Sequence, residues 1–158
     1  NGDAWVQKGT DIDGDAAYSE SGNAIEFSSD GNTLVIGASK SDVAASNAGH
    51  VRVYEWDTSD WVQKGLSMNG DDANNSFGYA VSISSDGNCI GIGSPLNSGG
   101  FVQGGQVKVF EWNGSAWNLK GTAPAGADNF DLFGFSVSLS ADGNTIATVT
   151  YTRLRAHE

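Results

Sequence analysis

Short runs in which apolar and polar side chains alternate recur along this chain and predict β-strands. Residues 80–84 alternate small or polar with apolar side chains, the period-two pattern of a strand with two different faces. The runs 24–28 and 136–140 alternate in the same way. A nearly continuous apolar run follows at residues 90–93, which is typical of a strand covered on both faces.

Turn residues separate these runs and complete a four-stranded unit. Asp86-Gly87 predicts a tight hairpin turn, because Asp and Gly tolerate the positive φ angles of a primed turn. Residues 107–112 are rich in β-branched and aromatic side chains and predict a third strand. Asn113-Gly114 then predicts the turn into a fourth strand at residues 117–120. We therefore expect four short antiparallel strands in succession.

The unit repeats about every 56 residues without gaps, since WVQKG at Trp5 and Trp61 and WNLKG at Trp117 stand in the same register. Four antiparallel strands at this period describe a propeller blade, with a length nearer to kelch-type than to WD-type blades. We predict an all-β chain, a single partial β-propeller over residues 1–158. Its repeats are 5–60, 61–116 and a truncated 117–158, which gives two full blades and parts of two others.

An incomplete propeller has a physical consequence. Known closed propellers need at least about four blades, and an open one exposes apolar sheet faces and an unpaired strand edge. We therefore expect a homo-oligomer, or a part of a larger chain or complex that completes the ring. The tail 148–158 diverges from the repeat and becomes basic, so its origin as native sequence stays open.

The start of each first strand points to a family. Phe77-Gly78 and Phe133-Gly134, with a weaker Ser21-Gly22, precede the apolar strand, and Gly37-Ala38-Ser39 or Gly93-Ser94-Pro95 follows it. This order resembles the FG-GAP repeat of the propeller at the N-terminus of integrin α chains and in many secreted or surface proteins. The resemblance implies a binding or adhesion module that is extracellular or otherwise exported.

Charge and composition limit the partners. The chain has 158 residues and a formal net charge of −11, and its eight basic residues are scattered, which argues against binding of nucleic acid. An acidic chain suits cations, but acidity also simply keeps a surface soluble. No apolar stretch is long enough to span a bilayer. The single Cys89 aligns with Thr33 and Thr145, which predicts a small buried residue.

Three carboxylates form the candidate metal site. Asp11, Asp13 and Asp15 stand at alternate positions around a glycine and could wrap a hard cation such as calcium, while an acidic solvated loop is the alternative. Calcium-binding members of the family carry several aspartates in the first hairpin loop. Each loop here has one aspartate, too few for six to eight oxygen ligands, so we predict turns there and no cofactor.

The tryptophans are the other repeated candidates. They could stack on sugar rings, although residues copied at the same place in every repeat usually pack between repeats. Asn74 and Asn113 begin glycosylation sequons at predicted loops, and the sequence does not say whether they are used. The five tryptophans are Trp5, Trp56, Trp61, Trp112 and Trp117.

The hypothesis is a non-enzymatic binding or adhesion module whose loops contact a protein or glycan. One alternative is a scaffold subunit of a larger complex with no ligand of its own. A propeller hydrolase or lyase is a weaker alternative, because no His, Ser and Asp set stands at an informative spacing.

Overall fold

The computed structural model describes residues 4–150, which form eleven β-strands and no helix. The chain is thus all-β, as predicted. A first sheet has the strand order β1-β2-β3-β4, and the short β5 pairs with β3. Its strands are β1 (Ser21–Phe27), β2 (Thr33–Ala38), β3 (His50–Trp56), β4 (Trp61–Gln63) and β5 (Met68–Asn69).

The middle repeat contains the four strands that its sequence predicts. This second sheet has the order β6-β7-β8-β9, and each strand pairs antiparallel with the next. A third sheet consists of β10 and β11, also antiparallel. These strands are β6 (Ala80–Ile83), β7 (Cys89–Ser94), β8 (Gln106–Trp112), β9 (Trp117–Leu119), β10 (Val137–Leu139) and β11 (Ile146–Thr148).

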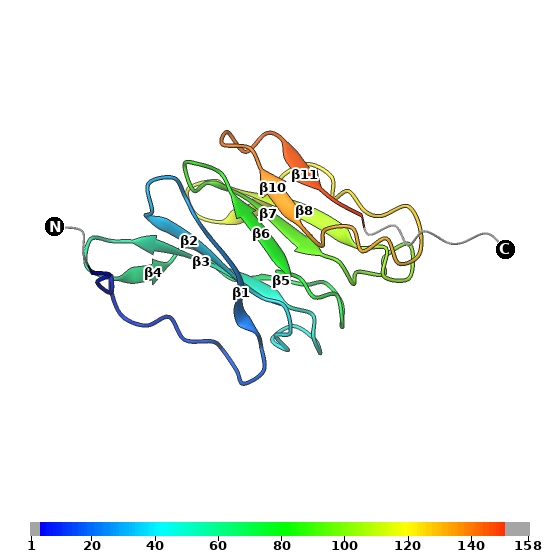
Figure 1. The fold of residues 1–158 in the computed structure, drawn as a ribbon, viewed down its shortest axis with the longest axis horizontal. Coiled ribbons are helices and arrows are strands. Elements are labelled where there is room, and N and C mark those ends of the chain that lie inside the picture. The colour runs from blue at the N-terminus through cyan, green and yellow to red at the C-terminus, as the bar shows by residue number, and fades with distance from the viewer. Residues whose placement is uncertain (1–3, 151–158) are drawn as a thin grey trace.

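The three sheets lie side by side in chain order, with the second between the other two (Figure 1). The main core lies between the first and second sheets, where Val35, Val51 and Val53 pack against Ile90 and Ile92. All residues of β2 and β7 are buried, because each has a covered surface on both sides. This confirms the prediction of a buried strand at 90–93. Residues 4–150 form no closed ring of sheets.

The first hairpin turn of each repeat differs from the predicted one. Ser28 donates its N–H to the Thr33 carbonyl, so four residues form the loop, and only Gly31 has positive φ, at 68°. The Gly31 N–H bonds back to the Ser28 carbonyl, which is the pattern of a longer loop built around a type I turn. The two-residue primed turn was wrong, because the serine hydroxyl and the aspartate stabilise the longer loop.

Two further differences concern the segments between repeats. WVQKG at Trp5 aligns with the predicted fourth strand at residues 117–120 and so predicts an outer strand of a preceding unit, but residues 5–8 form no strand. A fourth strand needs a third strand to pair with, and residues 4–150 hold none for it. The short β5 was not predicted; it extends the outer edge of the first sheet by pairing Met68 with Val51 and Asn69 with His50.

Neighbouring sheets meet through glycines at equivalent positions. A Cβ atom on Gly37 would overlap the carbonyl oxygen of Gly78, and one on Gly93 would overlap that of Gly134. Gly78 has a φ of 85° and Gly134 a φ of 88°, which L side chains rarely adopt. The Phe-Gly pairs found in the sequence therefore mark the places where one sheet meets the end of the preceding sheet's second strand.

Candidate functional site

Loops of successive repeats are joined to one another at one edge of the stack. The loops after β2 and β7 and the segments that lead into the next repeat share one edge, which we call the loop edge (Figure 1). Backbone bonds tie these pieces together: Asn74 N–H donates to the Ser46 carbonyl at 2.8 Å, and Phe130 N–H donates to the Val102 carbonyl at 2.8 Å. The loop edge is therefore a framework that spans successive repeats.

Non-glycine residues with positive φ recur on this framework at equivalent positions. Tyr18, Asn74 and Phe130 have φ between 62° and 66°, although this position carries an aromatic ring in two repeats and an amide in the third. Such backbone conformations cost on the order of 1–3 kcal/mol each and cluster at functional sites. Two further positions repeat in the same way. They are occupied by Glu20, Ser76 and Leu132, and by Asn47 and Gln103.

Several exposed apolar side chains stand on the loop edge. Tyr18 is 93% exposed, Val102 55% and Phe130 46%. Phe101 and the glycines around it line a hollow of about 220 Å³. Sequence reasoning missed these residues. Aligning the repeats gives no signal for these residues one by one, because no position within residues 17–21, 73–77 and 129–133 carries the same residue in all three repeats.

The three aspartates of the candidate metal site have separate partners. Asp11 accepts a hydrogen bond from Gln7 Nε2 at 2.9 Å, and Asp15 accepts one from Ser41 Oγ at 2.9 Å. Asp13 contributes its backbone carbonyl, which accepts from Arg52 at 2.8 Å. Among residues 4–150, no group of three or more His, Cys, Asp or Glu side chains is placed to hold a metal ion.

A buried imidazole lies beside this loop. His50 Nδ1 is 3.8 Å from Asp15 Oδ2 and has no hydrogen-bond partner within the described part of the chain. Burial lowers the pKa of His50, and the Arg52 charge lowers it further, while Asp15 raises it. Burial raises the pKa of Asp15, but its bonds with Ser41 and nearby groups outweigh this, so the net shift is downward. Neutral histidine and ionised aspartate are the favoured pair.

The hairpin aspartates act within their own turns. Asp30 Oδ1 accepts from Ser28 Oγ at 2.6 Å and from Asn32 N–H at 3.0 Å. These bonds, that with the Ser28 hydroxyl first, lower the pKa of Asp30 to about 2. The same bonds recur at Asp86 and Asp142 and lower the pKa of both carboxyls. The Oδ1 atoms of these three aspartates are therefore already engaged in hydrogen bonds within their own turns.

Four of the tryptophans form two ring pairs, one where β3 meets β4 and one where β8 meets β9; the first pair is edge-on and the second is tilted. The ring centroids are 5.3 Å apart in both the Trp56–Trp61 and Trp112–Trp117 pairs. Trp117 Nε1 donates to the Lys64 carbonyl at 2.8 Å and so joins the two sheets. Trp5, by contrast, is fully exposed.

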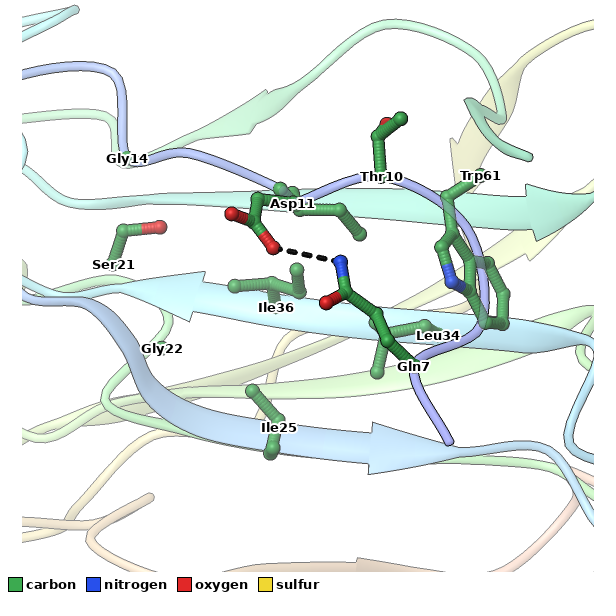
Figure 2. Close-up of a pocket in the computed structure, with 11 residues that line it drawn as sticks. Gln7, Thr10, Asp11, Gly14, Ser21, Gly22, Ile25, Leu34, Ile36 and Trp61 are labelled. Carbon is green, nitrogen blue, oxygen red and sulfur yellow. Dashed lines mark hydrogen bonds between the residues drawn. The ribbon is translucent and has the colours of Figure 1, made fainter. Parts of the chain in front are cut away.

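A groove of about 360 Å³ runs along the outer face of the first sheet (Figure 2). Ile25, Leu34 and Ile36 of β1 and β2 form its floor, and the segment that carries Gln7 and Asp11 passes over them (Figure 2). The Trp61 ring closes one end (Figure 2). Ile12 and Trp61 pack against Leu34 and Ile36, which are buried. Ile25, by contrast, is 62% exposed, so the groove is open to solvent over β1.

The sequons and the cysteine lie where the sequence places them. Asn74 and Asn113 are exposed loop residues, and Asn113 Oδ1 accepts bonds from the Ser115 and Ala116 backbone. Cys89 is buried, as predicted, and burial raises its pKa. Residues 151–158 of the divergent tail lie outside the described part.

Comparisons with known proteins identify no family for this chain. The chain matches no known protein-family profile, and no curated protein is significantly similar to it in sequence. Within residues 4–150, no helix is both long and apolar enough to cross a bilayer.

Proposed function

We propose that this chain is a non-enzymatic binding or adhesion module whose sheets are propeller-type blades of the FG-GAP kind. Its loop edge contacts a protein or a glycan, and it acts outside the cell or is otherwise exported. The FG-GAP resemblance of Phe77-Gly78 and Phe133-Gly134 supports this proposal, as does the contact that each glycine makes with the preceding sheet.

The observation that carries the proposal is the recurrence of one backbone conformation under different side chains. Tyr18, Asn74 and Phe130 hold the same left-handed φ, and so do Asn47 and Gln103. A framework that keeps its backbone while its side chains vary presents different chemistry from the same positions. The exposed rings of Tyr18 and Phe130 suit stacking on a sugar face or packing on a protein surface.

A scaffold subunit without a ligand is the second candidate. It is favoured by the open groove of the first sheet, which an assembled complex would cover.

Catalysis has weaker support. Asp15, His50 and Ser41 lie together, but the Ser41 hydroxyl donates to Asp15 and not to the imidazole. An activated serine needs the reverse order, with histidine between serine and aspartate. A hydrolase or lyase is therefore the least favoured alternative.

A loop exchange tests the binding proposal. Residues 96–104 are replaced by the equal-length segment 40–48, and the chimaera is compared with the parent on arrays of glycans and of purified extracellular-matrix proteins. We expect the parent to bind members of one array and the chimaera to lose at least tenfold in affinity for them. The melting temperature should stay close to that of the parent, because both segments share one backbone course.

The matched control changes the opposite edge. Residues 57–60 are replaced by residues 113–116, whose hairpin loop is closed by the equivalent backbone bond, and binding should persist. If the parent binds nothing on either array, or if both exchanges weaken binding equally, the loop edge is not the binding surface. The scaffold alternative would then be preferred.

A further inference from the structure

The groove of the first sheet corresponds, residue by residue, to a contact that is filled elsewhere in the chain. Each apolar residue of the groove has an equivalent one repeat further along the chain. These equivalents belong to the core between the first and second sheets or pack against it. That core is closed by Val35, Val51 and Val53, which project from the first sheet. The apolar groove residues Ile12, Ile25, Leu34, Ile36 and Trp61 become Met68, Val81, Ile90, Ile92 and Trp117.

One side of the missing contact is already in place. Lys8 Nζ lies 3.4 Å from the Gly31 carbonyl and 3.3 Å from Asn32 Oδ1. Lys64 makes the equivalent contacts with the second sheet, at 3.3 Å and 3.1 Å. The Trp61 indole also donates to the Lys8 carbonyl at 2.9 Å, as Trp117 does to that of Lys64. Residues 5–8 therefore occupy the place of a fourth strand of a preceding sheet.

We propose that the groove is the docking site for a further β-sheet of the same repeat type, and that the third strand of that sheet pairs with residues 5–7. The partner must present β-branched side chains at the places of Val35, Val51 and Val53. It must also carry a tryptophan opposite Trp5, as Trp56 lies opposite Trp61 in β3 and β4. The full exposure of Trp5 and the 85% exposure of Val6 follow from this assignment.

The partner must also have glycine at the end of its second strand. A Cβ atom at Gly37 or Gly93 would overlap the next sheet, whereas a Cβ atom on Gly22 would meet nothing within 4 Å. Gly22 is therefore free to receive such a strand end. The third sheet of a second copy does not fit this requirement, because Val149 stands at the glycine position and β11 pairs with no third strand among residues 4–150. The partner is a more complete sheet.

A second hollow, of about 300 Å³, follows the same rule. It lies between the second and third sheets and is lined by Val109, Pro124, Leu139 and Ile146. One repeat earlier, these positions are Val53, Met68, Ile83 and Ile90, all buried in the core. The rings of Phe110 and Trp117 pack against that core from β8 and β9. The hollow thus lies where the third and fourth strands of the third sheet would pack.

A tandem chain tests the proposal. A copy of residues 5–60 is inserted before Trp5, so that a copied β3 runs through its turn directly into residues 5–7. We expect the melting temperature to rise by about 5 °C or more over the parent. Hydrogen exchange of peptides covering residues 5–14 and 21–27 should slow at least tenfold, because these segments become covered and paired.

The control is the same tandem chain with Gly37→Val in the copied repeat only, which should lose both gains. In a second pair, Ile25→Lys should leave the parent's melting temperature unchanged and should lower that of the tandem chain. The proposal is overturned if exchange shows a folded second sheet while residues 5–14 and 21–27 stay as open as in the parent. It is also overturned if the valine makes no difference. Because the proposal rests on the blade character of the sheets and not on a ligand, a negative loop exchange leaves it standing.

Discussion

The single aspartate of each hairpin loop is a structural residue. Asp86 Oδ1 accepts hydrogen bonds from Ser84 Oγ at 2.6 Å and Asn88 N–H at 3.0 Å, and Ser84 Oγ in turn accepts from Cys89 N–H. These bonds connect the residues at the start of the loop with those at its end.

Asp86→Ala should therefore destabilise the protein by about 1–3 kcal/mol, since three bonds to a charged acceptor are lost, the third from Asn88 Nδ2 to Asp86 Oδ2. Urea unfolding measures the change. Asp72→Ala removes another exposed carboxylate, for which no hydrogen bond is found among the described residues, and it should cost less than about 0.5 kcal/mol. Equal effects of the two substitutions would contradict the role of the turn.

The turns also predict behaviour in acid. The folded pKa of Asp30 is about 2, below its ordinary value of 3.8, so its contribution to stability is complete above pH 3.8 and is lost as the pH falls through 2. Ser28→Ala removes the largest cause of the shift and should raise the pKa of Asp30 toward 3.8. Carbon-detected NMR of the carboxyl group measures both values, and an unchanged pKa in the variant would contradict the assignment.

His50 also makes stability depend on pH, because the fold favours a neutral base there rather than an ionised acid. Its folded pKa lies below the ordinary 6.5, so the unfolded chain binds a proton more readily and stability falls as the pH drops below 6.5. His50→Gln introduces the residue found at the equivalent Gln106 and should flatten the dependence of the melting temperature between pH 7 and pH 5. A variant with the same slope as the parent would show that other groups cause it.

At the scale of elements, local patterns predicted most strands. Alternation located β6 and β10, and the apolar run located β7, because each depends on side chains within a few residues. The bounds of β1 were missed, since a bulge at Gly22 and Asn23 lets it begin at Ser21, before the alternation starts.

Features that depend on another sheet could not be predicted. The pairing of β5 with β3 needs the chain to return along the outer edge of the sheet after Gly65, and two residues carry no pattern of their own. The separate partners of Asp11 and Asp15 depend on where Gln7 and Ser41 fold back, which spacing does not reveal. The groove likewise appears only when the repeats are superposed on a structure.

The close contact between glycines of neighbouring sheets, as between Gly37 and Gly78, limits how near the sheets can approach. Gly37→Ala places a methyl group against the Gly78 carbonyl, where backbone rather than a movable side chain would have to shift. We expect a loss of about 2–4 kcal/mol in urea unfolding. Gly100→Ala is the control, because nothing lies within 4 Å of its added carbon and it should be nearly neutral. A neutral Gly37→Ala would mean that the sheets can separate freely.

At the scale of the whole molecule, cover is unequal along the stack. The second sheet lies between two others, whereas the third has two short strands and borders a hollow. In repeat proteins, stability is roughly a sum of units and their neighbouring contacts, so the ends open first. Amides of β10 and β11 should exchange with deuterium at least tenfold faster than those of β7. Uniform exchange would indicate one cooperative unit.

Because the contacts between sheets recur without gaps, they also affect which duplications or deletions in the gene the fold can accept. Several of these contacts join a residue to one a full repeat further along, as in Asn23 Nδ2 with the Tyr79 carbonyl and Ser29 with the Ser85 carbonyl. A genetic event that duplicates or deletes one whole repeat in frame leaves both halves of every remaining contact compatible, whereas a partial event breaks them. Unequal recombination can thus lengthen or shorten this architecture in whole steps. Val149 stands where Gly37 and Gly93 allow the next sheet to approach, so a repeat added after the third sheet would lack this glycine contact.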